Sequence, residues 1–550
     1  MAQSAVALAE GPLRGVSRVD DWVHDAIDNG SAAMPSDTDP KPNPTAHDAP
    51  TALPEGALFT DDTTWQVARA DKFALIVDAA DYFRVLRKVF IGAKKELLLI
   101  GWDFDFELEM LPGEGDEDGL APDGLPNQLG SFIEAIVARS PDLNVYMLKW
   151  NGAVLAAPGR LAPAIALSMF GSDRIHFALD GHHPFGACHH QKIVVADDAL
   201  AFCGGIDATE KRWDTSEHLP DDPRRICKDG APSGPWHDAT SALSGPAAAA
   251  LAELSRRRWH RANGEALTPP RDTPPTSWPD GLDVDATNID VAVSRTEPPF
   301  DEKPLINEIE QLYLDGIKAA RQVIYIESQY FAAESICAAL EERLHEEGGP
   351  EIVVINPVEA ESQLEDNAMH VLRQRMVERL EAADHQNRFR IYFPVTKAGE
   401  PIYVHAKIMV VDDILLKIGS SNINDRSMGF DTECDVAIAE PAEVIENSRI
   451  RLISEHLDVT PNEFADAFAS ERRFIPTIER LNRQEGRGLR KVTRDSASAI
   501  GEVLADTRLL DPRYHPGEET NAGRGLRPRH LAILAGGVAL SWLAWRKWGK

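Results

Sequence analysis

Basic residues are in short supply in this chain of 550 residues. Lys and Arg number 57 against 88 Asp and Glu, which gives a formal net charge of −31. An excess of negative charge repels polyphosphate, so this balance argues against a nucleic-acid partner held on a broad basic surface. The balance does not exclude a small basic region around a single site. We therefore expect no nucleic acid among the partners.

Cysteine is equally sparse. The chain has five cysteines, an odd number, and none is arranged in the C-x-x-C pairs that bind metal ions or form redox sites: Cys188, Cys203, Cys227, Cys337 and Cys434. We expect buried or free thiols in a reducing compartment. Residues 1–12 also lack the basic start and the apolar run of a secretory signal, which favours a cytoplasmic location.

Long apolar runs are missing apart from one at the C-terminus. Leu531–Trp545 has no charged residue and is flanked by basic side chains such as Arg529 and Lys547. As a helix, this run would reach about 22 Å, which is less than the roughly 30 Å of a bilayer core. The basic flanks and the tryptophans favour membrane contact, and a helix docked on the protein is the alternative.

Proline divides the rest of the chain into segments. Six prolines between positions 35 and 54 predict a disordered leader, and a second proline-rich stretch predicts a linker between two halves. The predicted segments are a leader (1–55), a first repeat (56–263), a linker (264–290), a second repeat (291–465), a polar extension (466–526) and the membrane-contacting helix (527–550).

The two halves repeat the same order of elements. In each half a helical stretch leads into a run of apolar and β-branched residues, and two further short apolar runs follow. The matching pairs are 97–104 with 323–331, 144–151 with 351–357, and 174–179 with 388–393. Such runs between helices predict an α/β fold. We expect two tandem repeats, each a mixed β-sheet flanked by helices, that form a pseudo-two-fold dimer with the active site at their interface.

A His-x-Lys-x4-Asp motif follows the third run of each half. The residues stand at the same offsets in both: His190, Lys192 and Asp197, then His405, Lys407 and Asp412. Residues i and i+2 of a strand face the same side, so the His and Lys of each motif project into one pocket. The apolar residues that follow complete a buried strand, and the Asp stands at its end.

A glycine turn follows each motif, at 204–207 and at 419–422. At Gly205 the absence of a side chain would let the backbone approach a bound anion. Ser420 and Asn422 carry groups that can donate hydrogen bonds to phosphate oxygens. Asp207 takes the place of Asn422 in the first turn, and a carboxylate can donate only when it is protonated.

Two such motifs provide the groups that phosphodiester cleavage requires. One imidazole can attack phosphorus and form a covalent phosphohistidine, which divides a slow hydrolysis into two easier steps. The other imidazole can protonate the leaving alcohol and then deprotonate water. Lys192 and Lys407 can neutralise the charge that builds on the phosphate oxygens. No metal ion or other cofactor is expected.

With these motifs the chain resembles the phospholipase D superfamily over roughly residues 70–460. Four further sequence segments resemble the true phospholipases D of plants, fungi, animals and bacteria: 211-KRWDT-215, 235-PWHD-238, 324-IYIESQYF-331 and 422-NINDRSMGFDTE-433. The resemblance implies a glycerophospholipid substrate such as phosphatidylcholine, and phosphatidic acid and a free head group as products. It implies possible transfer of the phosphatidyl group to other alcohols.

The resemblance also implies the roles of the site residues. His190 corresponds to the nucleophile and His405 to the acid and base. Asp197 and Asp412 correspond to residues that orient a histidine, and Glu433 corresponds to an acidic position that orients the partner histidine. We expect a monomer that works at a phospholipid membrane surface.

Other interpretations are less well supported. A phosphatidyltransferase of the cardiolipin synthase type is the main alternative, although such enzymes usually begin with membrane-spanning helices. The charge of −31 disfavours a nuclease. A scaffold without turnover would not need both complete motifs. His182, His183 and His189 crowd the first motif but are better interpreted as structural or rim residues than as metal ligands.

The membrane hypothesis is tested by deleting residues 527–550. We expect less protein in the membrane fraction and unchanged activity on lipid presented in micelles, because the basic-flanked apolar run supplies the contact and not the chemistry. The measurement is the distribution of the protein between membrane and soluble fractions. An unaltered distribution would contradict the hypothesis.

Overall fold

The computed structural model describes residues 57–153, 171–270, 276–359, 363–492, 505–506, 508 and 511–513. The predicted leader (1–55) and the predicted membrane-contacting helix (527–550) lie outside these residues. Among the described residues, no helix combines the length and the apolar character needed to cross a bilayer. All five cysteines are buried and free.

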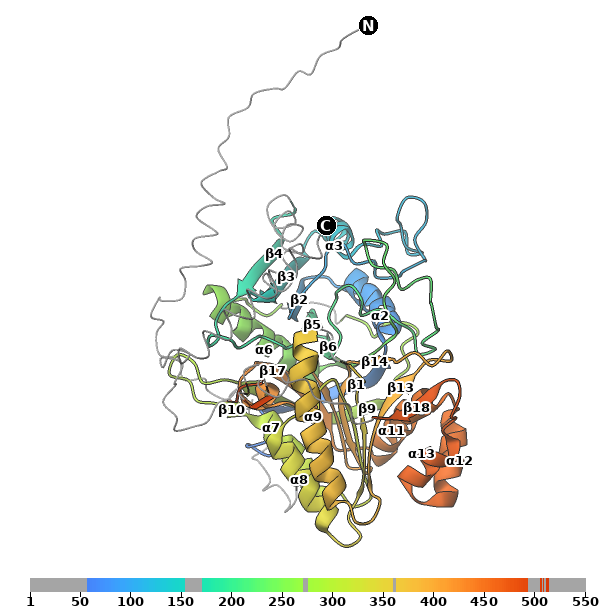
Figure 1. The fold of residues 1–550 in the computed structure, drawn as a ribbon. Helices are drawn as coiled ribbons and strands as arrows, with labels where there is room; N and C mark the ends of the chain where they lie inside the picture. The colour runs from blue at the N-terminus through green and yellow to red at the C-terminus, as the bar shows by residue number, and fades with distance from the viewer. Residues whose placement is uncertain are drawn as a thin grey trace, which may run out of the picture.

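The first half forms one mixed sheet that is covered by helices (Figure 1). Its strands lie in the order β1-β8-β6-β5-β2-β3-β4, in which β2, β3 and β4 are parallel and the other pairings are antiparallel. Its elements are β1 (Gln66–Val77), α2 (Ala79–Gly92), β2 (Glu96–Gly101), α3 (Leu129–Arg139), β3 (Asn144–Trp150), β4 (Ile175–Asp180), β5 (Ile193–Ala196), β6 (Leu200–Gly204), β7 (Trp236–His237), β8 (Ala239–Ser244) and α6 (Pro246–Asn263).

The second half repeats this plan in the order β9-β17-β16-β15-β11-β12-β13-β18. Its elements are β9 (Ala286–Glu297), β10 (Ile306–Asn307), α7 (Glu308–Ala319), β11 (Val323–Ser328), α8 (Glu334–His345), β12 (Glu351–Ile355), α9 (Gln363–Ala383), β13 (Phe389–Val395), β14 (Tyr403–Val404), β15 (Lys407–Val411), β16 (Leu415–Gly419), α10 (Asp425–Gly429), β17 (Glu433–Ile438), α11 (Ala442–Leu457), α12 (Pro461–Glu471), α13 (Phe474–Leu481) and β18 (Gly488–Lys491). The predicted echoes are confirmed as β2 with β11, β3 with β12, and β4 with β13.

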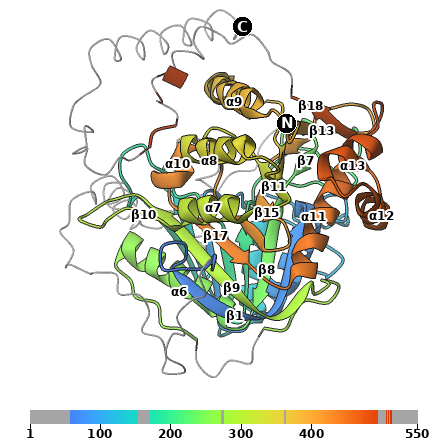
Figure 2. The same cartoon turned by 90° about the horizontal axis from the view of Figure 1, so that it is seen from below.

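The sheets of the two halves are continuous, because β1 and β9 pair antiparallel from Gln66 opposite Val293 to Phe73 opposite Ala286. The inner faces of the two sheets also share one apolar core, in which Cys203 Sγ lies 3.8 Å from Cys434 Sγ. Helices α2 and α3 cover the outer face of the first sheet, and α7, α8 and α9 lie side by side over the second (Figure 2). This is the predicted α/β pseudo-dimer.

The ordered second half is larger than the predicted range 291–465. Strand β9 begins at Ala286, inside the predicted linker, and β18 in the predicted extension pairs with β13 at the sheet edge. Helix α12 crosses the predicted boundary; it starts with a capping box between Thr460 and Glu463 and has Pro461 in its first turn. Capping box and proline are both N-terminal helix signals, so this helix was visible in the sequence.

Candidate active site

The segment before each motif strand is hydrogen-bonded to the opposite half. The His190 N–H donates to the Thr432 carbonyl at 2.9 Å, and the His405 N–H donates to the His237 carbonyl at 2.8 Å. Strand β14, just before His405, runs parallel to β7 of the first half. These crossed contacts bring the start of both motif strands to the seam between the two sheets.

Each imidazole is held by a carboxyl group that belongs to the other half. His405 Nδ1 lies 2.7 Å from Asp238 Oδ2, and His190 Nδ1 lies 3.1 Å from Glu433 Oε2 and 3.0 Å from the Ser420 carbonyl. Asp238 precedes β8 and Glu433 begins β17, which occupy equivalent places in the two sheets. Because Nδ1 of each ring is engaged, Nε2 is the atom left for chemistry.

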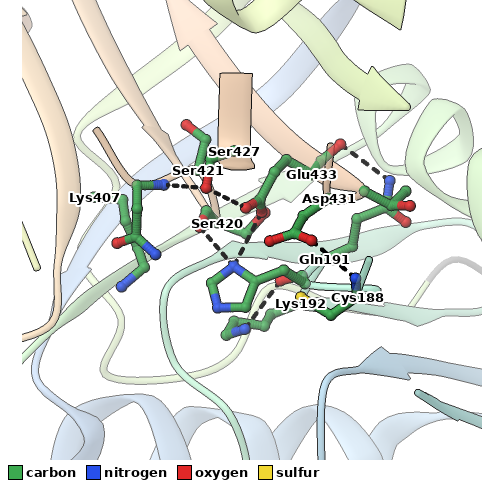
Figure 3. Close-up of polar contacts among 12 residues, drawn as sticks. Cys188, Gln191, Lys192, Lys407, Ser420, Ser421, Ser427, Asp431 and Glu433 are labelled. Atoms are coloured by element: carbon green, nitrogen blue, oxygen red, sulfur yellow. Dashed lines mark hydrogen bonds and ion pairs between the residues drawn. The ribbon is translucent and has the colours of Figure 1, made fainter. Parts of the chain in front are cut away.

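The two lysines lie beside the histidines and are almost fully buried. Lys192 Nζ donates to the His190 carbonyl at 2.9 Å and pairs with Asp207 at 3.0 Å. Lys407 Nζ donates to the His405 carbonyl and to Gln329 Oε1. Figure 3 shows Lys192 and Lys407 arriving from opposite halves near Glu433. Gln329, which lies in the segment 324-IYIESQYF-331, is thus a neighbour of the site.

The site is electropositive, and this changes the protonation of the imidazoles. Burial lowers the pKa of His190 and of His405 well below the usual value, and the positive charges of Lys192 and Lys407 lower both further. Burial also lowers the pKa of Lys407 to about 7, with Lys192 adding repulsion. A bound anion would offset the repulsion between these positive groups. Buried groups with shifted pKa values at one seam are typical of an active site.

The two orienting carboxyl groups differ in protonation. Burial raises the pKa of Glu433 to about 8, although hydrogen bonds from the Ser420 and Ser427 hydroxyls oppose this shift. Burial raises the pKa of Asp238 only to about 6, because Lys407 stabilises its charged form. At pH 7, Asp238 is therefore mostly ionised and Glu433 mostly neutral.

The motif aspartates do not orient the histidines, and this part of the expectation is wrong. The Asp197 carboxylate accepts the backbone N–H groups of residues 94, 95 and 96 and the Thr276 hydroxyl. The Asp412 carboxylate accepts the N–H groups of residues 321, 322 and 323 in the same way. Both stand at the far end of a strand, five residues beyond the lysine, where they cap the turn before β2 and before β11.

Residues of the two glycine turns contact the carboxyl groups that bind the histidines. A side chain at Gly205 would place its Cβ 2.2 Å from Asp238 Oδ1, so glycine here makes room for Asp238. The Ser420 hydroxyl donates to Glu433 at 2.5 Å. Asn422 is buried, and its Oδ1 has no hydrogen-bond partner among the described residues. Asp207 forms an ion pair with Lys192. Asp238 lies in the segment 235-PWHD-238. Its equivalence to Glu433 in the repeat is the sequence feature that could have indicated its role.

Fold and site together define a pseudo-dimeric α/β protein with two His-Lys motifs at one interface. A family model described as "Cardiolipin synthase, PLD-like domain" matches residues 313–451. Phospholipase D alpha 1 of Vigna unguiculata is 25% identical over 46% of this chain and 45% of its own length. The Arabidopsis thaliana protein of that name is 26% identical over 54% of this chain and 51% of its own length. Over these stretches the chain is similar to proteins of the phospholipase D superfamily.

Two further proteins are similar to this chain. Phospholipase D A of Dictyostelium discoideum is 22% identical over 70% of this chain and 36% of its own length. The crystal structure of a phosphatidylserine synthase from Haemophilus influenzae covers 80% of this chain and 94% of that chain at 12% identity, with a TM-score of 0.48. The chain spans about half the length, or less, of the curated relatives it matches.

The structural role of Asp412 is tested by Asp412→Ala. Loss of the acceptor leaves three backbone N–H groups unpaired, so we expect the free energy of unfolding to fall by about 2–4 kcal/mol. The turnover number of the folded protein should change by less than about threefold. Urea unfolding and initial rates measure the two effects, with the exposed neighbour in Asp413→Ala as control. A loss of turnover above a hundredfold at unchanged stability would restore the orienting role.

The unequal protonation of the carboxyl groups predicts unequal effects of amide variants. Asp238→Asn removes an ionised partner of His405 and should lower kcat/KM about 10³–10⁴-fold at pH 7. Glu433→Gln replaces a neutral carboxyl group by a neutral amide and should cost less than about tenfold at pH 7. Its deficit should grow above pH 8, where Glu433 of the parent protein ionises. Equal losses at pH 7 would contradict the assignment.

Proposed function

We propose that this chain is a phospholipase D that hydrolyses the distal phosphodiester bond of a glycerophospholipid, such as phosphatidylcholine, into phosphatidic acid and the free head group. The observation that carries the proposal is the crossed arrangement at the seam. The two imidazoles come from different halves, and a carboxyl group of the other half binds Nδ1 of each. Burial and the positive charges of both motif lysines lower the pKa of each imidazole. The phospholipase D relatives support the reaction class.

In the first step, His190 Nε2 attacks phosphorus and the bond to the head-group oxygen breaks. His405 gives its Nε2 proton to the departing alkoxide, which leaves as the alcohol. The low pKa of His190 keeps this imidazole neutral and able to attack. The negative charge of the bound phosphodiester raises the pKa of His405, which makes the protonated form needed as acid more abundant.

In the second step, His405 takes a proton from water and the hydroxide attacks phosphorus. The bond to His190 Nε2 breaks, phosphatidic acid leaves, and both imidazoles return to their starting states. Lys192 and Lys407 counter the charge on the phosphate oxygens in both steps. The imidazole of His190 is 16% exposed and that of His405 5%, so the more accessible ring is the one assigned to attack a lipid phosphate.

Phosphatidyl transfer of the cardiolipin synthase type is the second candidate, favoured by the family model that matches residues 313–451. It shares the first step and differs in the acceptor, which is an alcohol in place of water. In either reaction the substrate lies in a phospholipid surface, and we propose a cytoplasmic, membrane-associated monomer.

The reaction is tested with His190→Ala and His405→Ala on mixed vesicles that contain phosphatidylcholine and phosphatidylglycerol. Each variant should lower choline release at least about 10³-fold, because the two rings have different and indispensable roles. The measurement is free choline together with lipid products, with and without a primary alcohol. The control is His182→Ala, a half-buried histidine near the first motif. Release by either motif variant at a rate close to the parent would contradict the proposal, and cardiolipin as the main product would favour transfer.

A further inference from the structure

A second group of buried ionisable side chains lies directly behind Asp238. Asp78 follows β1, His218 lies in the loop between β6 and β7, His237 ends β7, and Glu455 belongs to α11 of the second half. One donor atom from each of the four lies within 4.8 Å of all the others. Four chain segments, drawn from both halves, therefore converge on one point that the proposed reaction does not use.

The donor atoms lie close enough together to surround one metal ion. Glu455 Oε1 lies 3.2 Å from His218 Nε2 and 3.2 Å from His237 Nδ1. Asp78 Oδ1 lies 3.3 Å from His237 Nδ1, and Asp78 Oδ2 lies 3.7 Å from His218 Nε2. Ligand atoms about 2.0–2.1 Å from a tetrahedral zinc ion are separated from one another by roughly 3.4 Å.

The far nitrogen of each imidazole is bound to a carboxylate. His218 Nδ1 lies 2.9 Å from Asp214 Oδ2, and His237 Nε2 lies 2.9 Å from Glu327 Oε2. When these nitrogens carry the proton, the lone pairs of His218 Nε2 and His237 Nδ1 point at Asp78 and Glu455. Carboxylates that fix the tautomer in this way are the usual outer partners of metal-binding histidines.

Two inward atoms are buried and have no hydrogen-bond partner in the part of the chain that the structure describes. These are Asp78 Oδ2 and His237 Nδ1, in side chains that are 1% and 0% exposed. Lone pairs and carboxylate oxygens that face one another repel unless positive charge lies between them. A divalent cation would satisfy both atoms and balance the charges of Asp78 and Glu455. The Arg487 guanidinium adds further positive charge, 3.7 Å from Glu455 Oε1.

We propose that Asp78, His218, His237 and Glu455 bind one structural zinc ion. Two neutral imidazoles and two carboxylates suit zinc, whereas calcium prefers six or more oxygen ligands and magnesium a hydrated octahedral site. The competing arrangement is a metal-free cluster in which both histidines are imidazolium ions.

The ion would position a catalytic group without touching the substrate. The His237 carbonyl accepts the His405 N–H, and the Asp238 N–H donates to Asp78 Oδ1 at 3.2 Å. The Asp78 N–H donates back to the Asp238 carbonyl at 2.8 Å. The zinc ligands thus fix the backbone that presents Asp238 to His405, and Glu455 ties the second half to it. No metal ion was expected from the sequence, and the proposed ion stays outside the reacting centre.

Metal analysis of the purified full-length protein tests the proposal whether or not the protein cleaves lipid. Elemental mass spectrometry should find about one zinc per chain in the parent protein. His218→Gln should lower the zinc content at least about tenfold. The control is His456→Gln: His456 contacts Glu327 from the other side and supplies none of the four ligands, so its zinc content should match the parent.

A second measurement on the parent protein covers a variant that fails to fold. Protein produced with cobalt in place of zinc should show the strong visible absorption of a four-coordinate ion, without a thiolate charge-transfer band. Removal of the metal should lower Tm by about 5 °C or more. Soluble parent protein without a stoichiometric transition metal, and with the same Tm before and after exposure to a chelator, would overturn the proposal. So would zinc that His456→Gln loses and His218→Gln retains.

Discussion

The contact on which the rest of the structure depends is the crossed pairing of histidine and carboxyl group at the seam. His405 of the second half is held by Asp238 of the first, and His190 of the first half by Glu433 of the second. Neither half contains both members of a pair. A single half would present an imidazole without its partner. The site is therefore complete only when the two halves of the sheet are assembled.

Burial makes this arrangement electrostatically demanding. Two lysines and two imidazoles share a space with little solvent, and the cost appears as depressed pKa values of Lys407 and of both histidines. In the proposed reaction, the phosphodiester brings the missing negative charge. On this proposal, the site is most favourable when an anion is bound, and binding promotes the protonation that the leaving group requires. The overall charge of −31 does not oppose this, because the positive groups are gathered at one buried seam.

The sequence predicted the features that recur in both halves. It did not predict contacts between residues that are far apart in the chain. Equal offsets in the two motifs located His190, Lys192, His405 and Lys407, and the echoing apolar runs predicted the paired sheets. The role of Asp197 and Asp412 was misjudged because an offset of seven along a strand says nothing about which backbone groups meet its far end. Asp238 was missed as the partner of His405, since its distance in sequence from that histidine hides a contact created by the crossing of the halves.

The same reasoning explains why the cluster behind Asp238 was not anticipated. His218, His237 and Glu455 are separated by long stretches of chain and match no ligand spacing in the sequence. Only the packing of α11 against the first half places Glu455 beside the two imidazoles. With a zinc ion bound, the cluster would both link the two halves and help to orient His405.

The most direct test of the central claim is to find the covalent intermediate. Parent protein mixed rapidly with phosphatidylcholine and quenched in alkaline denaturant, in which phosphohistidine survives, is digested and examined by mass spectrometry. We predict a phosphatidyl adduct on the peptide that contains His190, at the ring nitrogen. An adduct on another residue, or none during a measurable burst of choline release, would contradict the account.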